Sequence, residues 1–128
     1  MAYAHAEGSG TTASGEAAHS EGSSTVASAT NAHAEGSGTR ATESGAHSEG
    51  SSTRATGPSS HAENTGTRAE GFASHAEGAY TYAIGDYSHA EGGNSRAVGI
   101  YSHAENNSQA IGMYSHAEGI LTVANGAA

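Results

Sequence analysis

The chain has 128 residues, a formal net charge of −9 at pH 7, 19 glycines and no cysteine. This length allows one domain, and the missing cysteines exclude a disulfide framework and thiolate chemistry. The acidic balance, with only four lysine and arginine residues, argues against nucleic acid as a partner. No apolar run approaches the roughly 18 residues of a membrane helix, so we expect no membrane contact by this segment.

Such a polar composition would ordinarily predict disorder, but its periodicity overrides that prediction. A histidine recurs every fourteen residues, apart from a last interval of thirteen, and a glutamate stands two residues after each histidine. The histidines are His5, His19, His33, His47, His61, His75, His89, His103 and His116. The glutamates are Glu7, Glu21, Glu35, Glu49, Glu63, Glu77, Glu91, Glu105 and Glu118. All nine histidines belong to the repeat, so none is left for a separate catalytic role.

Each repeat has two five-residue halves. The first half, S-H-A-E-G or a near-copy, starts at 4–8 and returns as far as 115–119. The second half, such as T-R-A-T-G at 53–57, starts at 11–15 and returns as far as 122–126. The strict alternation within each half predicts a short β-strand, with Ala, Ser and Thr on the inner side. His and Glu then share the outer side of the first strand.

Two corners join these strands in every turn. The glycine after each glutamate is replaced by Asn64 and Asn106 in two turns. This exchange indicates a left-handed backbone at that corner, because asparagine is enriched among non-glycine residues at positive φ. We expect the corner after the second strand to be looser, since Ala29 and Glu43 occupy its glycine position.

The repeat therefore predicts an all-β solenoid with 14-residue turns of two short strands, in a single domain over residues 1–128. Turns stack at about 4.8 Å, so nine of them make a rod roughly 43 Å long. An interior of methyl and hydroxyl groups stabilises less than buried Val or Leu, which contribute roughly 1.5–3 kcal/mol each. With no cysteine to add a crosslink, we expect the chain to gain stability by oligomerising.

The period-fourteen pattern resembles the YadA-like head repeats of trimeric autotransporter adhesins, above all in S-R-A-V-G (95–99), S-Q-A-I-G (108–112) and T-Y-A-I-G (81–85). The H-A-E-G version is similar to head repeats in surface and phage-related proteins of Gram-positive bacteria. The resemblance covers about residues 3–126. It implies a left-handed parallel β-roll, a side-by-side homotrimer around a threefold axis and a role in adhesion. No stalk, neck or membrane anchor is recognisable, so the chain resembles a head fragment.

The outward His and Glu residues are uniform in all nine turns, whereas the outward residues of the second strand vary. A face with the same residues in every turn suggests that every turn makes the same contact. We therefore predict that these histidines and glutamates line the trimer interface as a hydrogen-bonded ladder. Neutral imidazole suits this role because it both donates and accepts. The alternative is a solvent-exposed polar ladder that keeps the sheet soluble. In the matched family apolar second-strand residues face the axis, and Ile84, Val98 and Ile111 would suit that position.

A separate feature lies on one corner of the C-terminal half. Apolar residues stack there from turn to turn, and they are Phe72, Tyr87, Ile100, Tyr101, Met113 and Tyr114. We call this group the corner ridge. We expect it to pack between subunits; an exposed ridge would instead be a candidate binding site.

Catalysis, metal binding and ice binding are weaker interpretations. Ser74 and His75 are neighbours on a strand and point to opposite sides, so we predict no nucleophile–base pair, no enzyme and no cofactor. A histidine and a glutamate two residues apart do share a face, and three chains could bring three imidazoles together in each layer, which is a plausible ligand set for zinc or nickel. Nine identical sites would be unusual, so no metal is predicted. The threonine column from Thr25 to Thr81 alternates to the inner side, which argues against an ice-binding surface.

The sequence thus favours a structural and adhesive role, as the trimeric head of a bacterial or phage surface fibre. A host matrix protein or glycan would bind its outer faces through many weak contacts. The alternative is a rigid spacer segment of a fibre without a ligand of its own. If the histidines are buried and neutral, acid is expected to weaken the assembly.

Overall fold

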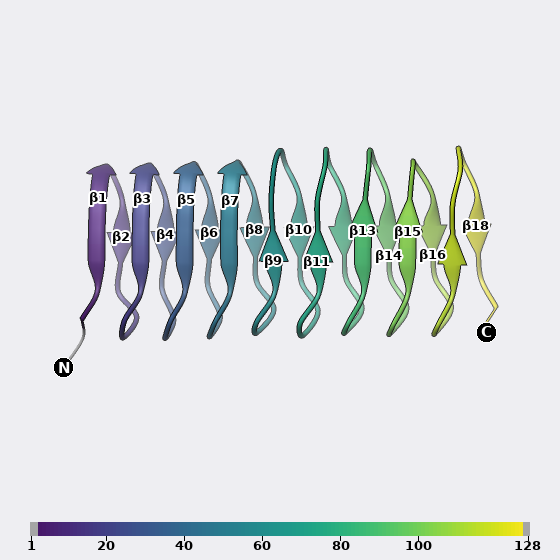
Figure 1. The fold of residues 1–128 in the computed structure, drawn as a ribbon, viewed down its shortest axis with the longest axis horizontal. Helices are drawn as coiled ribbons and strands as arrows, with labels where there is room; N and C mark the ends of the chain where they lie inside the picture. The colour runs from purple at the N-terminus through teal and green to yellow at the C-terminus, as the bar shows by residue number, and fades with distance from the viewer. Residues whose placement is uncertain (1–2, 127–128) are drawn as a thin grey trace.

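The computed structural model describes residues 3–126, which form a rod built from two parallel nine-stranded sheets (Figure 1). Each turn contributes one strand to each sheet. The first sheet contains β1 (His5–Ser9), β3 (His19–Ser23), β5 (His33–Ser37), β7 (His47–Ser51), β9 (His61–Ala62), β11 (His75–Ala76), β13 (His89–Glu91), β15 (His103–Glu105) and β17 (His116–Ala117). The second contains β2 (Thr12–Ala13), β4 (Val26–Ala27), β6 (Arg40–Ala41), β8 (Arg54–Ala55), β10 (Arg68–Ala69), β12 (Tyr82–Ala83), β14 (Arg96–Ala97), β16 (Gln109–Ala110) and β18 (Val123–Ala124). This architecture confirms the predicted all-β parallel solenoid.

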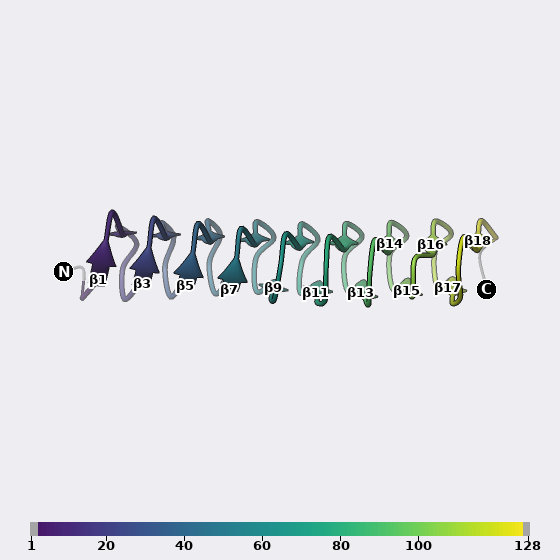
Figure 2. The same cartoon turned by 90° about the horizontal axis from the view of Figure 1, so that it is seen from above.

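Consecutive turns pair in register, so each residue lies beside its own copy in the next turn. His75 of β11 pairs with His89 of β13. The shorter interval near the C-terminus keeps the register, since His103 pairs with His116. Figures 1 and 2 show the turns stacked along one axis, with β1 and β18 at opposite ends. Within residues 3–126 no helix has the length and apolarity needed to cross a membrane.

The interior between the two sheets is filled by alanine, serine and threonine. Ala76 and Ala83 are completely buried, and so is Thr67. The Thr67 hydroxyl donates to the backbone carbonyl of Glu63 at 2.9 Å, which satisfies this polar group inside the narrow core. The alternation of strand residues is therefore as predicted, with small residues inside and the repeated His and Glu outside.

The corner after each glutamate has a left-handed backbone. The φ angle is 96° at Gly78, 75° at Asn64 and 56° at Asn106, which confirms the conformation predicted from the two asparagines. Successive corners are also closely stacked, because a Cβ atom on Gly78 would lie 2.1 Å from the carbonyl oxygen of Gly92. Glycine is favoured here both by the φ angle and by the distance to the next turn.

The corner after the second strand is a regular four-residue turn, so our expectation of a looser connection is wrong. The Ser88 N–H donates to the Gly85 carbonyl at 3.2 Å, and the same bond closes the corners that begin at Ala29 and Glu43. The third residue of the turn has a positive φ, which is 57° at Tyr87. A positive φ at the third position alone is typical of a type II turn.

Gly78→Ala is expected to lower the free energy of unfolding by roughly 1–3 kcal/mol, because alanine would be forced into a left-handed conformation and its Cβ would meet the Gly92 carbonyl. Gly93→Ala is the matched control, since Gly93 has no positive φ and no atom lies within 4 Å of its Cβ position. Thermal unfolding followed by circular dichroism measures both variants. Equal stabilities would contradict this account of the corner.

Candidate functional site

The outer face of the first sheet carries a column of imidazole rings beside a column of carboxylates. We call these two columns, made of the nine histidines and nine glutamates of the repeat, the ladder. Neighbouring rings stack face to face, with centroid distances from 4.6 Å between His33 and His47 to 5.0 Å between His5 and His19. The in-register pairing of parallel strands produces this stack, because each ring lies beside its own copy at the strand spacing.

In the C-terminal half, histidines bond to the glutamate of the preceding turn. The Nε2 atom of His75 lies 2.9 Å from Oε1 of Glu63, and the Nε2 atom of His103 lies 2.8 Å from Oε1 of Glu91. These bonds join consecutive turns and not residues of one strand. The side chains are partly exposed, 37% for His75 and 25% for Glu63. Each such pair therefore contributes modestly, about 0.2–1 kcal/mol.

In the N-terminal half, histidines face the glutamate of their own turn at longer distances. The Nε2 atom of His19 lies 3.3 Å from Oε2 of Glu21, and that of His33 lies 3.4 Å from Oε2 of Glu35. Several Nε2 atoms in this region are shielded from solvent and make no hydrogen bond, namely those of His19, His33, His47 and His61. The imidazole nitrogens in this half of the ladder are therefore free to form a hydrogen bond or to bind a ligand if the rings turn.

Two histidines of this region have a perturbed pKa. Burial lowers the pKa of His33 and of His47 below the ordinary value of 6.5, and the adjacent imidazoles lower it further. Glu35 and Glu49 act in the opposite direction without offsetting the effect. Both rings are therefore neutral at pH 7, and each keeps a lone pair that can accept a hydrogen bond or ligate a metal.

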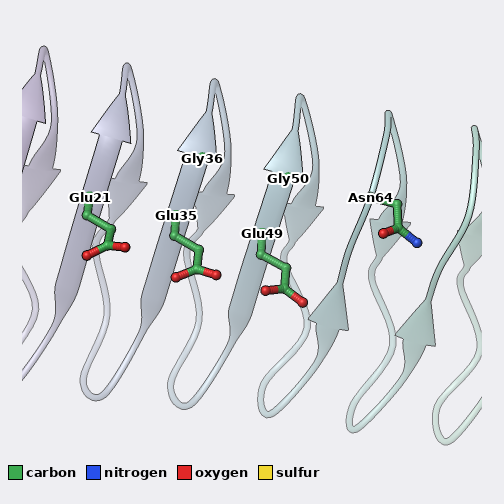
Figure 3. Close-up of a pocket in the computed structure, with 6 residues that line it drawn as sticks. All are labelled: Glu21, Glu35, Gly36, Glu49, Gly50 and Asn64. Atoms are coloured by element: carbon green, nitrogen blue, oxygen red, sulfur yellow. The ribbon is translucent and has the colours of Figure 1, made fainter.

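The glutamates of the second to fourth turns line a shallow acidic groove. Its volume is about 500 Å³, and its lining consists of Glu21, Glu35, Gly36, Glu49, Gly50 and Asn64. In Figure 3 the three carboxylates repeat the same orientation from turn to turn. Two like unit charges 4 Å apart repel by about 1 kcal/mol in water, so such a column favours the approach of cations.

The structure brings potential metal ligands together from consecutive turns. Among residues 3–126, five groups of ladder residues place three ligand atoms within 4.8 Å of one another. They are His61–Glu63–His75, His75–Glu77–His89, His89–Glu91–His103, Glu35–His47–Glu49 and Glu105–His116–Glu118. The sequence suggests ligands from one turn or from three chains in one layer. It does not reveal these groups, because their third ligand comes from the neighbouring turn of the same chain.

The corner ridge is exposed on the single chain. Tyr87, Tyr101 and Tyr114 are 48%, 49% and 55% exposed, and their rings stack at 4.9 and 5.1 Å. All three have a positive φ of 57° or 58°. A left-handed backbone costs an ordinary residue roughly 1–2 kcal/mol. The ridge is thus an aromatic column held on strained positions, and strain of this kind is concentrated at functional sites.

Ser74 and His75 are neighbours in the repeat and lie on opposite sides of their strand. Ser74 is buried, and its hydroxyl donates to the Gly71 carbonyl at 2.8 Å, whereas His75 lies on the outer face. The two side chains are therefore not a nucleophile and its base. The threonine column is completely buried, as predicted, and consists of Thr25, Thr39, Thr53, Thr67 and Thr81.

Acid is expected to destabilise the rod below about pH 6.5, the ordinary pKa of histidine. Because the pKa of His33 and of His47 is lowered in the folded state, the unfolded chain takes up protons first as the pH falls. The contribution of these two neutral histidines to the free energy of unfolding is present above pH 6.5. It is lost as the pH falls from 6.5 through their folded-state pKa values. Melting temperatures between pH 7.5 and 5.0 measure this loss.

A double variant isolates the two histidines responsible for this loss. His33→Gln with His47→Gln should make the melting temperature less sensitive to pH. His5→Gln is the control, because the His5 side chain is 62% exposed. A melting temperature of the unaltered chain that stays flat over the whole range would contradict the neutral, shielded state of these rings.

Comparison with protein-family models and with curated proteins finds no match for this chain. The likeness to YadA-like head repeats is therefore an expectation drawn from the repeat motif. The functional interpretation depends on the geometry of the ladder and of the corner ridge.

Proposed function

We propose that this chain is a structural and adhesive element of a bacterial or phage surface fibre, a left-handed β-roll that assembles side by side as a homotrimer. The observation that carries the proposal is the corner ridge, an exposed aromatic column on a rod with a thin core. The handedness, the threefold arrangement and the surface location come from the resemblance to YadA-like head repeats.

The composition of the interior supports a need for assembly. The largest completely buried side chains are threonines, and the rest of the core is alanine and serine. Burial of such small groups contributes less per residue than burial of Leu or Phe. Contact between chains would add the apolar burial that the interior lacks.

The ridge supplies apolar surface for such a contact. Ile100 and Met113 are 40% and 46% exposed beside the tyrosines. Phe72 packs edge to face on Tyr87 at 5.3 Å, and the tyrosine rings then stack on one another. Because these rings cover each other's faces, the column presents mainly ring edges. That geometry suits packing against another subunit better than stacking against a sugar ring.

The ladder face is the other candidate for the contact, as its uniformity predicts. His75 and His89 already bond to glutamates of their own chain. The Nε2 atoms of His19 and His47 make no hydrogen bond, but they are shielded, so a neighbouring subunit would bond to them only after the rings turn outward. We place the ridge first, because its exposed aromatic side chains stack into one continuous apolar column. The ladder interface stays a prediction.

An adhesive ligand would bind the outer faces of the assembly. The space between the sheets is occupied by buried Ala, Ser and Thr side chains, so a ligand has no place inside the rod. Three parallel copies would multiply weak contacts by raising the effective concentration of each. The regular register of the turns equally supports a rigid spacer, which is the second candidate function.

Light scattering on a sizing column at neutral pH is expected to give about three times the chain mass of 12.6 kDa. Replacing Tyr87, Tyr101 and Tyr114 by asparagine tests the ridge, because asparagine tolerates a positive φ and Asn31 already occupies the equivalent corner with a φ of 56°. The triple variant should keep its circular dichroism and become monomeric. A monomeric unaltered chain would overturn the trimer, and a trimeric variant would move the contact to another face.

A binding assay on the folded assembly distinguishes an adhesive head from a rigid spacer. Immobilised protein should retain a host matrix protein or a glycan from an array if it is an adhesive head. Retention by this chain on its own supports adhesion. Absence of retention by a folded trimer supports the spacer.

A further inference from the structure

We propose that the ladder is a linear array of binding sites for divalent transition-metal cations such as Zn²⁺. A single chain supplies all three ligands of each site. The inference therefore goes beyond the proposed function, and it does not depend on the trimer.

Each His–Glu–His group takes its ligands from two consecutive turns. In the group His61–Glu63–His75 the three ligand atoms lie within 4.8 Å of one another, and the His75 Nε2 atom is already 2.9 Å from Glu63 Oε1. Tetrahedral zinc, with ligand bonds of about 2.0–2.2 Å, needs ligand atoms about 3.4 Å apart. Side-chain movements of roughly 1–2 Å are therefore enough to close the site around an ion.

One ring of each pair has to turn for both nitrogens to reach the same ion. The planes of His61 and His75 differ by only 3°, so their nitrogens point in parallel directions. Rotation about one Cβ–Cγ bond corrects this, and both side chains are about one-third exposed, which leaves room on the solvent side. Water would occupy the fourth position, as is usual for a zinc site with three protein ligands.

The charge of the ladder and its unbonded imidazole nitrogens favour a cation. The register places glutamate beside glutamate, as for Glu35 and Glu49, so the carboxylates repel one another without an intervening positive charge. The Nε2 atoms of His47 and His61 are shielded and have no hydrogen bond to give up. The net charge of −9 attracts cations to the whole rod.

Shared ligands determine how many ions fit. The middle group, His75–Glu77–His89, shares a histidine with the group on each side, so an ion there excludes both neighbours. The fullest arrangement leaves that group empty and fills the other four, which gives four ions per chain. The two sites with two imidazoles should bind zinc more tightly than the two with two carboxylates, because imidazole suits zinc whereas carboxylate ligands suit calcium and magnesium.

Calorimetric titration of the complete chain with zinc chloride at pH 7.5 tests the proposal. We expect two tightly bound ions per chain, weaker binding of two more, and a melting temperature that rises with zinc concentration. Calcium is the control cation because it prefers oxygen ligands. If calcium binds as tightly as zinc, the ladder attracts cations only through its acidic groove, and the proposal is wrong. The absence of zinc binding would also overturn the proposal.

Two variants test the shared-ligand arrangement. Glu77→Gln removes a ligand from the middle group alone, so the number of tightly bound zinc ions should stay at two. Glu63→Gln with Glu91→Gln leaves the middle group as the only complete one of the three groups with two imidazoles, so the number of tightly bound ions should drop to one. Circular dichroism confirms that both variants are folded. An equal number of tightly bound zinc ions in the two variants would overturn the assignment of ligands. If a variant fails to fold, the comparison of zinc with calcium on the unaltered chain still tests the proposal.

Discussion

In-register stacking of identical turns is the constraint on which the rest of the structure depends. Parallel pairing at the strand spacing places every residue beside its own copy in the next turn. The side chain at each position must therefore pack against an identical or similar side chain. Alanine meets this condition inside the rod because its methyl group fits between closely spaced sheets. Glycine meets it at the first corner, where a Cβ atom on Gly78 would contact the next turn. Imidazole and phenol rings meet it outside by stacking on their neighbours.

Glutamate is the residue that meets the condition least well. Its copies form a column of like charges, which parallel pairing cannot separate. In the C-terminal half the histidine of the next turn compensates by bonding to the carboxylate, as His89 does to Glu77 at 2.9 Å. In the N-terminal half the pairs are longer and several imidazole nitrogens are unbonded. The ladder is thus chemically uneven although its sequence is uniform, and its less satisfied half coincides with the acidic groove.

The two halves of the rod also differ on the corner that carries the ridge. Positions that hold Ala17, Asn31 and Gly45 in the early turns hold Tyr87, Tyr101 and Tyr114 in the later ones, always at positive φ. Asparagine and glycine satisfy that backbone at low cost, whereas alanine and tyrosine do not. A strained, exposed aromatic column is therefore not explained by the stability of the single chain. Contact with another surface is the physical reason that we favour for it.

The repeat motif by itself determined the solenoid, the inward alanine, serine and threonine, the shared outer face of His and Glu and the left-handed corner at Asn64 and Asn106. All of these follow from alternation and backbone preference, which are properties of a few consecutive residues. Only the tertiary structure decided that His75 bonds to Glu63 of the previous turn, that three ligand atoms meet across two turns and that the tyrosines occupy left-handed positions in regular turns. These features depend on side-chain rotamers and on the spacing between turns, and neither is encoded by the alternation within one strand.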